Sequence, residues 1–546
     1  MKWKIRMTML AAGFLCATAL PAYAASTGAQ GNVTTMTALP GSTEPFLTHA
    51  TLIGVHDPNS TMSITVALHL QNQSQLQSLL HDQYTKGSSE YHQWLKPGEF
   101  TSKFGPSVAQ YQTVMNYLQS SGLHIQKTYA NRMLIDVTGN TKNIEQTFGV
   151  QIGNYKVGSK NFYAPQSSVK LPTQVSSLIS AVIGLSNYHQ MHTHLIMKQT
   201  ATAHQLTATS GYTPSQIETA YNYNPLYNEG INGSGVTIGI LTADTYNSSD
   251  IATFDQAYGL PTPSVTDVNV GGTPSQINPE TTLDLEWSSA TAPGANVIMY
   301  EGANSSLGTF TDVYNAAASA DAAQVLSTSW GTAESNMSQS ELTADDNIFS
   351  QMASQGQSVF VASGDNGATD GTSNLAVDYP SSDPYVTACG GTKLILNSND
   401  TIQSETGWSG SGGGQSSVWS EPSWQTGENV PQDGQRQTPD IALNADPNTG
   451  YSFYYNGAWN VAGGTSFVAP QMTATFALID QDLAYQGYSS IGEADPNIYQ
   501  DAAYNYNTDF NQITSGNNGY YSCGPGYNNV TGWGSINATN FVNDLG

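Results

Sequence analysis

Two hydrophobic patterns follow one another along the chain. Up to about residue 200, short stretches of alternating apolar and polar residues stand among segments with an apolar residue every three or four positions. The first pattern is typical of half-buried strands and the second of amphipathic helices. Together they predict a compact α+β domain. Its predicted strands are residues 62–70 and 132–137, and its predicted helices are residues 74–83, 107–121 and 141–148.

Beyond residue 200, continuous apolar runs alternate with amphipathic segments. Continuous apolar runs are typical of strands that are buried on both faces. The alternation therefore predicts an α/β fold, a largely parallel sheet with helices on both faces, in which functional sites collect at the carboxyl ends of strands. The predicted strands are residues 236–241, 295–300, 323–328 and 358–362, and the predicted helices are residues 249–258, 309–320, 341–355 and 467–483.

The start of the chain has the pattern of an export signal. Three basic residues precede the apolar run 7–20, and Ala22-Tyr23-Ala24 follows it. We predict a signal peptide at residues 1–24 that is removed after Ala24. An N-terminal membrane helix is the alternative, but the run is shorter than the roughly 20 residues that span a bilayer. The mature protein is expected to be secreted, either extracellular or periplasmic, and not to bind a membrane.

Charge and histidine change at the same place in the 546-residue chain. Residues 25–200 carry ten basic and seven acidic side chains, whereas residues 201–546 carry 34 acidic side chains and two basic ones. All ten histidines lie at or before His204. We therefore predict a boundary near residue 200 between a domain of residues 25–200 and a domain of residues 201–546. The net charge of -26 argues against a nucleic-acid partner.

A candidate nucleophile lies in the segment Gly463-Gly464-Thr465-Ser466. This segment follows an apolar run and opens a helix, so Ser466 should lie where backbone N–H groups and the helix dipole can stabilise an oxyanion. An ordinary helix N-cap is the alternative. A nucleophilic serine needs a base, and no histidine follows His204. The base is therefore predicted to be a carboxylate.

Candidate carboxylates occur on a predicted helix and after a predicted strand. Glu280 and Asp284 are four residues apart in a helix that starts at Pro279, so they share one face. Their repulsion raises the pKa of at least one of them, although a solvated acidic face is the alternative. Asp365 follows the apolar run 358–362. If protonated it could donate a hydrogen bond to an oxyanion, although a turn residue is the alternative.

Four motifs follow one another in the C-terminal domain, and three more lie in the N-terminal domain. They are Glu280-x-x-Leu-Asp284, Ser329-Trp330-Gly331, Ser363-Gly-Asp365 and Gly464-Thr-Ser466-x-x-x-Pro470, and, in the N-terminal domain, Tyr91-His92-Gln93-Trp94-Leu95, Phe104-Gly105-Pro106 and Asn131-Arg132. In type and order, the first four resemble the motifs of the sedolisin or serine-carboxyl peptidase family, and the N-terminal domain resembles the pro-kumamolisin-type activation prosegment of that family. The resemblance implies a subtilisin-like α/β fold preceded by a ferredoxin-like α+β prosegment.

The resemblance implies a role for each candidate residue. Ser466 would be the nucleophile, Glu280 the general base and acid, Asp284 its orienting partner, and Asp365 the oxyanion donor. The implied function is a secreted, acid-active serine-carboxyl endopeptidase that cleaves proteins or peptides through an acyl-enzyme, although tripeptidyl-peptidase activity stays open. A secreted non-catalytic binding protein that keeps the fold is the alternative. A Ser-His-Asp triad is excluded unless His204 serves the catalytic domain.

The opposite charges of the two domains predict a zymogen. A prosegment of about +3 should bind a peptidase domain of about -32 at neutral pH and leave it in acid. We expect a monomer that its own prosegment inhibits and that matures autocatalytically by cleavage within residues 192–210. His189, His192, His194 and His204 lie near this joint and are expected to gain charge around pH 6, unless they are simply exposed linker residues.

Two features depart from the family pattern. The family's calcium frame is present, but its two carboxylate positions hold Gln512 and Asn528. Because amide oxygens alone hold calcium weakly, we expect no required cofactor and doubt that calcium binds there. A third acid found in some members after the first strand is replaced, since Thr242 follows the run 238–241. Cys389 and Cys523 are the two cysteines of the mature chain, and the sequence does not decide whether they pair.

Overall fold

The computed structural model describes residues 35–198, 206–274 and 276–546. The predicted signal peptide and His204 lie outside the described residues, and the boundary predicted near residue 200 adjoins residues outside them. Residues 36–546 form one compact unit. None of the helices in the described ranges combines the length and apolarity needed to cross a bilayer. Cys389 and Cys523 are not bonded to each other.

The N-terminal part, residues 36–198, is built on a four-stranded antiparallel sheet in the order β4-β5-β3-β9. Helix α3 connects β3 to β4 and helix α4 connects β5 to β9, which makes the βαββαβ order of a ferredoxin-like fold. The predicted α+β class is confirmed. The elements are β3 (Thr61–Leu68), α3 (Val108–Ser120), β4 (His124–Thr128), β5 (Leu134–Asn140), α4 (Thr141–Phe148) and β9 (Ile179–Ile183).

Smaller elements extend this sheet domain. Two helices are inserted between β3 and α3, and a second sheet in the order β2-β6-β7 follows the first one. The linker at the end of this part contains two very short strands, β10 and β11. The elements are β1 (Met36–Ala38), η1 (Pro45–His49), β2 (Thr51–Val55), α1 (Gln73–Gln83), α2 (Pro97–Lys103), β6 (Ile152–Val157), β7 (Lys160–Pro165), β8 (Lys170–Pro172), α5 (Thr173–Ser176), β10 (His192–Thr193) and β11 (Ile196–Met197).

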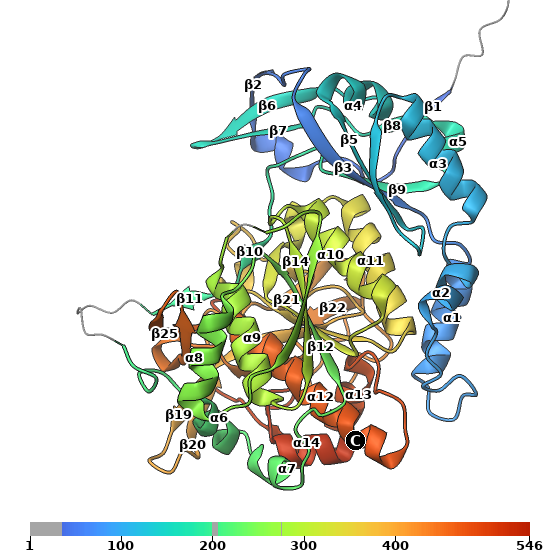
Figure 1. Cartoon of the computed structure of the whole chain (residues 1–546). Coiled ribbons are helices and arrows are strands. Elements are labelled where there is room, and N and C mark those ends of the chain that lie inside the picture. The colour runs from blue at the N-terminus through green and yellow to red at the C-terminus, as the bar shows by residue number, and fades with distance from the viewer. Residues whose placement is uncertain (1–34, 199–205, 275) are drawn as a thin grey trace, which may run out of the picture. The chain divides into compact units, whose positions relative to one another are not determined.

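The C-terminal part, residues 206–546, contains the predicted parallel sheet (Figure 1). Its order is β13-β14-β12-β15-β17-β19-β20, with β23 also paired to β19, and every pair except β19–β20 is parallel. The strands are β12 (Thr237–Ala243), β13 (Ser264–Val270), β14 (Asn296–Gly302), β15 (Val325–Thr328), β17 (Ser358–Ala362), β19 (Thr387–Leu396), β20 (Ile402–Gly407) and β23 (Ile441–Asn444).

Helices cover both faces of this sheet. In β17, Phe360 and Ala362 enter the core that contains residues of α9 and α12, whereas Val359 and Val361 enter the core that contains residues of α10 and α11. Successive residues of a strand point to opposite faces, so the two helix pairs lie on opposite faces. The helices are α6 (Pro214–Ala220), α7 (Asn224–Asn228), α8 (Ser248–Tyr258), α9 (Pro279–Thr291), α10 (Leu307–Ala320), α11 (Gln339–Ser354), α12 (Val468–Gln486), α13 (Asp495–Asp509) and α14 (Ala538–Leu545).

The remaining elements flank the sheet at its loops. Strand β16 follows β15 after a single residue and pairs with β18, and β24 and β25 form a hairpin that leads into the helix α12. These elements are β16 (Trp330–Ala333), η2 (Glu334–Asn336), η3 (Gly367–Thr369), β18 (Asp378–Tyr379), β21 (Gly414–Ser420), β22 (Gln435–Thr438), η4 (Pro447–Thr449), β24 (Tyr451–Tyr455), β25 (Ala458–Gly463), η5 (Thr465–Phe467), β26 (Phe510–Asn511) and β27 (Ser535–Ile536).

The N-terminal part packs against α10 and α11. Leu134 and Ile183 of its sheet share one hydrophobic core with Phe310 and Phe349 of these helices. Polar contacts fix the same interface. The buried Asn131 side chain donates to Asn315 Oδ1 at 2.6 Å and to Gln351 Oε1 at 3.0 Å.

A second anchor of the N-terminal part comes from the loop between α1 and α2. The indole N–H of Trp94 donates to the Ser490 carbonyl at 3.0 Å. A Cβ at Gly356 or Gly492 would lie 2.5 Å from the Trp94 ring, so both positions need glycine. Trp94 and Asn131 belong to the motifs that resemble an activation prosegment, and the structure shows that both are interface residues.

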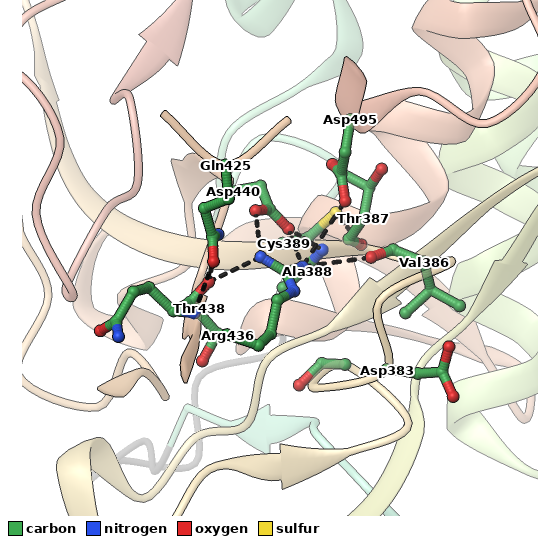
Figure 2. Close-up of polar contacts among 12 residues, drawn as sticks. Asp383, Val386, Thr387, Ala388, Cys389, Gln425, Arg436, Thr438, Asp440 and Asp495 are labelled. Atoms are coloured by element: carbon green, nitrogen blue, oxygen red, sulfur yellow. Dashed lines mark hydrogen bonds and ion pairs between the residues drawn. The ribbon is translucent and has the colours of Figure 1, made fainter. Parts of the chain in front are cut away.

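One of the two basic residues of the C-terminal part is fully buried. The Arg436 guanidinium donates to both carboxylate oxygens of Asp440 at 2.6 Å and lies 3.5 Å from Asp495 Oδ2 (Figure 2). Asp440 also accepts from the Ala388 N–H at 2.7 Å. The three charged groups are 0% exposed, and their ion pairs connect β22 to the start of α13, while the Ala388 N–H connects Asp440 to β19.

Candidate active site

Ser466 lies where the sequence predicts it, in η5 just before helix α12, and it is fully buried. The preceding Gly464 has φ +117°. A Cβ at Gly464 would lie 2.0 Å from the carbonyl oxygen of His194 and 2.5 Å from Asp365 Oδ2. The position therefore requires glycine both for its backbone angle and for the close approach of these two oxygens.

Glu280 and Asp284 both lie on α9, which is buried along its length. The alternative of a solvated acidic helix face is therefore wrong. Burial, followed by the charge of Asp284, raises the pKa of Glu280 well above its usual value, and the nearby Ser466 hydroxyl lowers it in part. Burial raises the pKa of Asp284 to about 8. This carboxyl pair is therefore able to retain a proton at pH values at which exposed carboxyls ionise.

The Ser329 side chain connects Asp284 to the serine segment. Its hydroxyl donates to Asp284 Oδ1 at 2.6 Å, and its oxygen lies 3.3 Å from the carbonyl oxygen of Ser466. Ser329 separates β15 from β16 and is 0% exposed. The sequence marks the Ser329-Trp330-Gly331 motif but gives no sign that this hydroxyl binds Asp284.

Asp365 lies at the carboxyl end of β17, as predicted. Its Oδ1 accepts from the Thr465 N–H at 2.8 Å and from the Thr465 hydroxyl at 3.0 Å. Its Oδ2 is buried and has no hydrogen-bond partner in the described part of the chain. Burial raises the pKa of Asp365 to about 6, against the lowering effects of His194 and Thr465. Below that pH Asp365 is protonated and can donate a hydrogen bond.

Thr242 lies within β12 and not after this strand. Its hydroxyl accepts from the Trp330 indole N–H at 3.0 Å and lies 3.0 Å from the Thr281 hydroxyl. Thr281 follows Glu280 in α9, so these hydroxyls connect β12 to the helix that carries the Glu280–Asp284 pair.

The linker at residues 190–198 runs through this site as an extended strand. Strand β10 pairs antiparallel with β16, and β11 pairs antiparallel with β25. Between them, the His194 N–H donates to the Ser329 carbonyl at 3.1 Å. The His194 carbonyl accepts from the Ser466 N–H at 3.2 Å. One carbonyl of the chain itself therefore lies at Ser466, near the unpartnered Oδ2 of Asp365.

The side chain of His194 enters a small acidic pocket. Its Nε2 lies 3.3 Å from Asp378 Oδ2, and the exposed fractions of the two side chains are 5% and 0%. Burial raises the pKa of both Asp378 and the neighbouring Asp370 well above the usual value, and each carboxyl interacts with the other. A Cβ at Gly331 would lie 2.0 Å from Asp378 Oδ1. The sequence analysis missed this pocket, although both acids follow Asp365 closely in the chain.

Comparison with known proteins matches both parts of the chain. Residues 48–188 match the family described as "Pro-kumamolisin, activation domain", and residues 269–507 match the "Subtilase family". Kumamolisin of Bacillus sp. (strain MN-32) is 30% identical over 509 residues, covering 87% of this chain and 90% of the relative. This chain belongs to the sedolisin family of serine peptidases. It carries an activation prosegment followed by a subtilisin-like peptidase domain, as the resemblance predicts.

Further relatives and a solved structure agree with membership of the sedolisin family. Sedolisin of Pseudomonas sp. (strain 101) is 28% identical over 520 residues, covering 87% of this chain and 86% of the relative. Tripeptidyl-peptidase 1 of Bos taurus is 23% identical over 521 residues, covering 89% and 92%. The structure of Pseudomonas sedolisin with two molecules of pseudo-iodotyrostatin matches 61% of this chain and 98% of that chain, with a TM-score of 0.56 and 28% identity.

The sedolisin calcium frame fits a cation poorly in this chain. The side-chain oxygen of Asn528 accepts from the Val530 N–H at 3.1 Å and from the Thr531 N–H at 3.0 Å, so it closes its own turn. Gln512 and Asn528 also carry no negative charge. The doubt about calcium at this frame stays a prediction.

The prosegment histidines differ from expectation. Burial, followed by Lys160 and His192, lowers the pKa of His189 to about 3, and burial also lowers the pKa of His192. The expectation that they charge around pH 6 is therefore wrong for these two residues.

Surface ion pairs do not account for the expected attraction between the prosegment and the peptidase domain. Within the described residues, the His194–Asp378 contact is the one ion pair that joins them.

Proposed function

We propose that this sedolisin-family peptidase is a secreted, acid-active serine-carboxyl endopeptidase made as a zymogen. The observation that carries the proposal is the His194 carbonyl, which accepts a hydrogen bond from the Ser466 N–H while its own N–H donates to the Ser329 carbonyl. A peptide held by both groups has its carbonyl carbon next to the Ser466 hydroxyl. The site is therefore suited to acyl transfer.

The chemistry follows from the protonation of the carboxyls. The Ser466 oxygen bonds to the carbonyl carbon while its proton passes to Glu280, which accepts it in the state in which the Glu280–Asp284 pair holds a single proton on Asp284. The Ser466 N–H and a protonated Asp365 donate to the oxyanion that forms. The C–N bond then breaks, Glu280 returns the proton to the leaving amine, and water hydrolyses the acyl-enzyme by the reverse sequence. Asp284, held by Ser329, orients Glu280 and shares its proton.

Acid dependence follows from Asp365. Its pKa of about 6 means that it donates to the oxyanion below this pH and becomes a repelling charge above it. Activity should therefore fall by about tenfold for each pH unit above about 6, as expected for one essential proton.

The first maturation cut is assigned to the bond between His194 and Leu195. His194 supplies the carbonyl at Ser466, and Ile196 and Met197 continue on the other side along β25. This bond lies inside the predicted range 192–210. Because the linker already occupies the site, the reaction is expected to be intramolecular, and its rate should not depend on protein concentration.

The pocket of His194 supports a preference for basic residues on the acyl side of the cut. Asp378 faces the imidazole at 3.3 Å, and Asp370 adjoins Asp378. A lysine, arginine or protonated histidine in this place would favour the ionised form of Asp378 and pair with it, whereas an acidic residue would find no counter-ion.

A pH series tests the proposal with the full-length chain and its Ser466→Ala variant. Processing and casein cleavage between about pH 2 and 7 span the titration of carboxyl groups and histidine. We expect both activities in acid for the native chain and neither for the variant, with a first product that begins at Leu195. Activity at neutral pH or activity that survives the substitution would refute the mechanism. Absence of activity at every pH would favour the binding-protein alternative.

A further inference from the structure

Three carboxylates meet near the C-terminus, away from the catalytic carboxyls. Asp501 lies within α13, Asp509 ends α13, and Asp544 lies on α14. One oxygen from each lies within 4.8 Å of the others. Two separate helices thus bring three carboxylates close together. Their mutual repulsion destabilises the fold unless a positive charge lies between them.

The burial of Asp509 is a separate indication of a ligand. Asp509 is 0% exposed, and neither of its carboxylate oxygens has a hydrogen-bond partner in the described part of the chain. Asp501 is 4% exposed, and its Oδ2 also has no partner there, although Asn505 donates to its Oδ1 at 2.8 Å. A buried carboxylate that lacks both a donor and a counter-ion is rarely stable, so a binding partner is expected.

No basic residue of the peptidase domain supplies this partner. Lys393 lies 3.7 Å from Asp446, and Arg436 is bound to Asp440 and Asp495. These are the two basic residues beyond residue 200. Lys86 of the prosegment lines the same cavity as Asp501 and Asp544 but makes no ion pair with the three acids in the described part of the chain.

We propose that Asp501, Asp509 and Asp544 form a site for a divalent cation, with the size and charge preference of Ca²⁺. Calcium binds oxygen at about 2.3–2.6 Å, so two of its ligands can lie as much as about 5 Å apart. The 4.8 Å limit on the spacing of the three oxygens agrees with this distance. Magnesium keeps several of its waters and is usually bound through one or two carboxylates, so a site with three carboxylates favours calcium.

A cavity provides the access and the water that such an ion needs. It has a volume of about 440 Å³, and Asp501, Asp544 and the terminal Gly546 line it. Calcium takes six to eight oxygen ligands, so water from the cavity would complete the coordination. The ion would join the end of α13 to the C-terminal helix α14. This site is separate from the frame of Gln512 and Asn528, and it has no part in the proposed peptide cleavage.

Calcium binding to the full-length Ser466→Ala chain tests the proposal without interference from self-digestion. After removal of metals with a chelator, calorimetric titration with CaCl₂ at pH 7 should give one site with a Kd of roughly 10⁻⁵ to 10⁻³ M. Terbium should bind in competition with calcium. The unfolding temperature should rise with the calcium concentration and saturate in the same range.

Variants locate the ion. Asp544→Asn changes an exposed side chain, so the chain should fold, and the affinity should fall at least tenfold because one of three charged ligands is lost. Glu229→Gln removes an equal charge from an exposed position and should leave the affinity unchanged. Absence of calcium binding at pH 7 would overturn the proposal and leave shared protons to stabilise the carboxylates. Binding that Asp544→Asn leaves unchanged would also overturn it.

Discussion

Replacing Asp378 with asparagine should change the peptide specificity of the enzyme more than its catalytic power. Asp378 is fully buried and lies 3.3 Å from the imidazole of His194. In the proposed maturation cut, His194 takes the place of the substrate residue on the acyl side. The substitution keeps the shape of the side chain and removes the carboxyl group that a neighbouring cation would favour in its ionised form. A hydrogen bond to a charged group contributes about 1.5–3 kcal/mol, which corresponds to a change of roughly 10- to 150-fold in rate.

The assay compares quenched fluorescent peptides that carry the sequence of residues 190–198. One peptide keeps histidine at the position of His194, and two others carry lysine or leucine there. At acidic pH, kcat/KM for the histidine and lysine peptides should fall by the factor above in Asp378→Asn, while kcat/KM for the leucine peptide should change little. An Asp267→Asn variant, with the same charge change at an exposed site, is the matched control.

The ratio of kcat/KM between the lysine and leucine peptides decides the outcome. An equal loss for both peptides would mean that Asp378 supports the active site as a whole, for example through the nearby Asp365, and the specificity argument would be refuted. An unchanged ratio with unchanged rates would show that the contact with His194 contributes no binding energy.

Three other predictions address the oxyanion donor, the buried ion pair and the prosegment. Asp365→Asn should lower kcat/KM, and the fall of kcat/KM with rising pH should begin above about pH 6, because an amide donates a hydrogen bond at every pH. An unshifted pH profile would assign that fall to another group. Arg436→Met in the Ser466→Ala chain should lower the free energy of unfolding, measured by urea titration, by about 3–5 kcal/mol, because Asp440 and Asp495 stay buried without their cation. A change below about 1 kcal/mol would contradict this prediction. His92→Phe should lower the pH at which the prosegment leaves the peptidase domain in the Ser466→Ala chain, because burial keeps the pKa of His92 at about 4. Tryptophan fluorescence follows this opening, and an unchanged midpoint pH would exclude His92 as a pH sensor.

The elements that carry the catalytic candidates could be predicted because their signals are local. The four-residue spacing of Glu280 and Asp284 determines their shared helix face, and the glycines before Ser466 mark the turn into α12. Asp365 follows directly from its place after an apolar strand. In each case a few neighbouring residues define the position, so the structure and the sequence agree.

The acidic pocket and the path of the linker could not be predicted in the same way. His194, Ser329 and Asp378 are far apart in the chain, and strand pairing across three elements brings them together.

Composition also gives a wrong expectation of where the charged side chains lie. The 34 acids of the peptidase domain suggest a solvated acidic surface, yet the acids of α9 are fully buried. A count of charges contains no information about which of them the fold encloses.

The burial of charge at the prosegment interface changes the expected route of activation. Asp136 of the prosegment interacts with Asp312 of α10, and burial and this like charge raise the pKa of Asp312 well above the usual value. In the same way, burial and the charge of Glu341 of α11 raise the pKa of Glu44. Raised carboxyl pKa values mean that the docked state binds more protons, so these contacts strengthen as the pH falls. The lowered pKa of His192, which lies on β10 against β16 of the peptidase domain, has the opposite effect, because the docked state loses stability as the pH falls below about 6.5. The two effects oppose each other, so acid alone is a weak means of expelling the prosegment. Under the proposed mechanism, cleavage of the linker requires acid through Asp365, and this cleavage is then the step that commits the zymogen to activation.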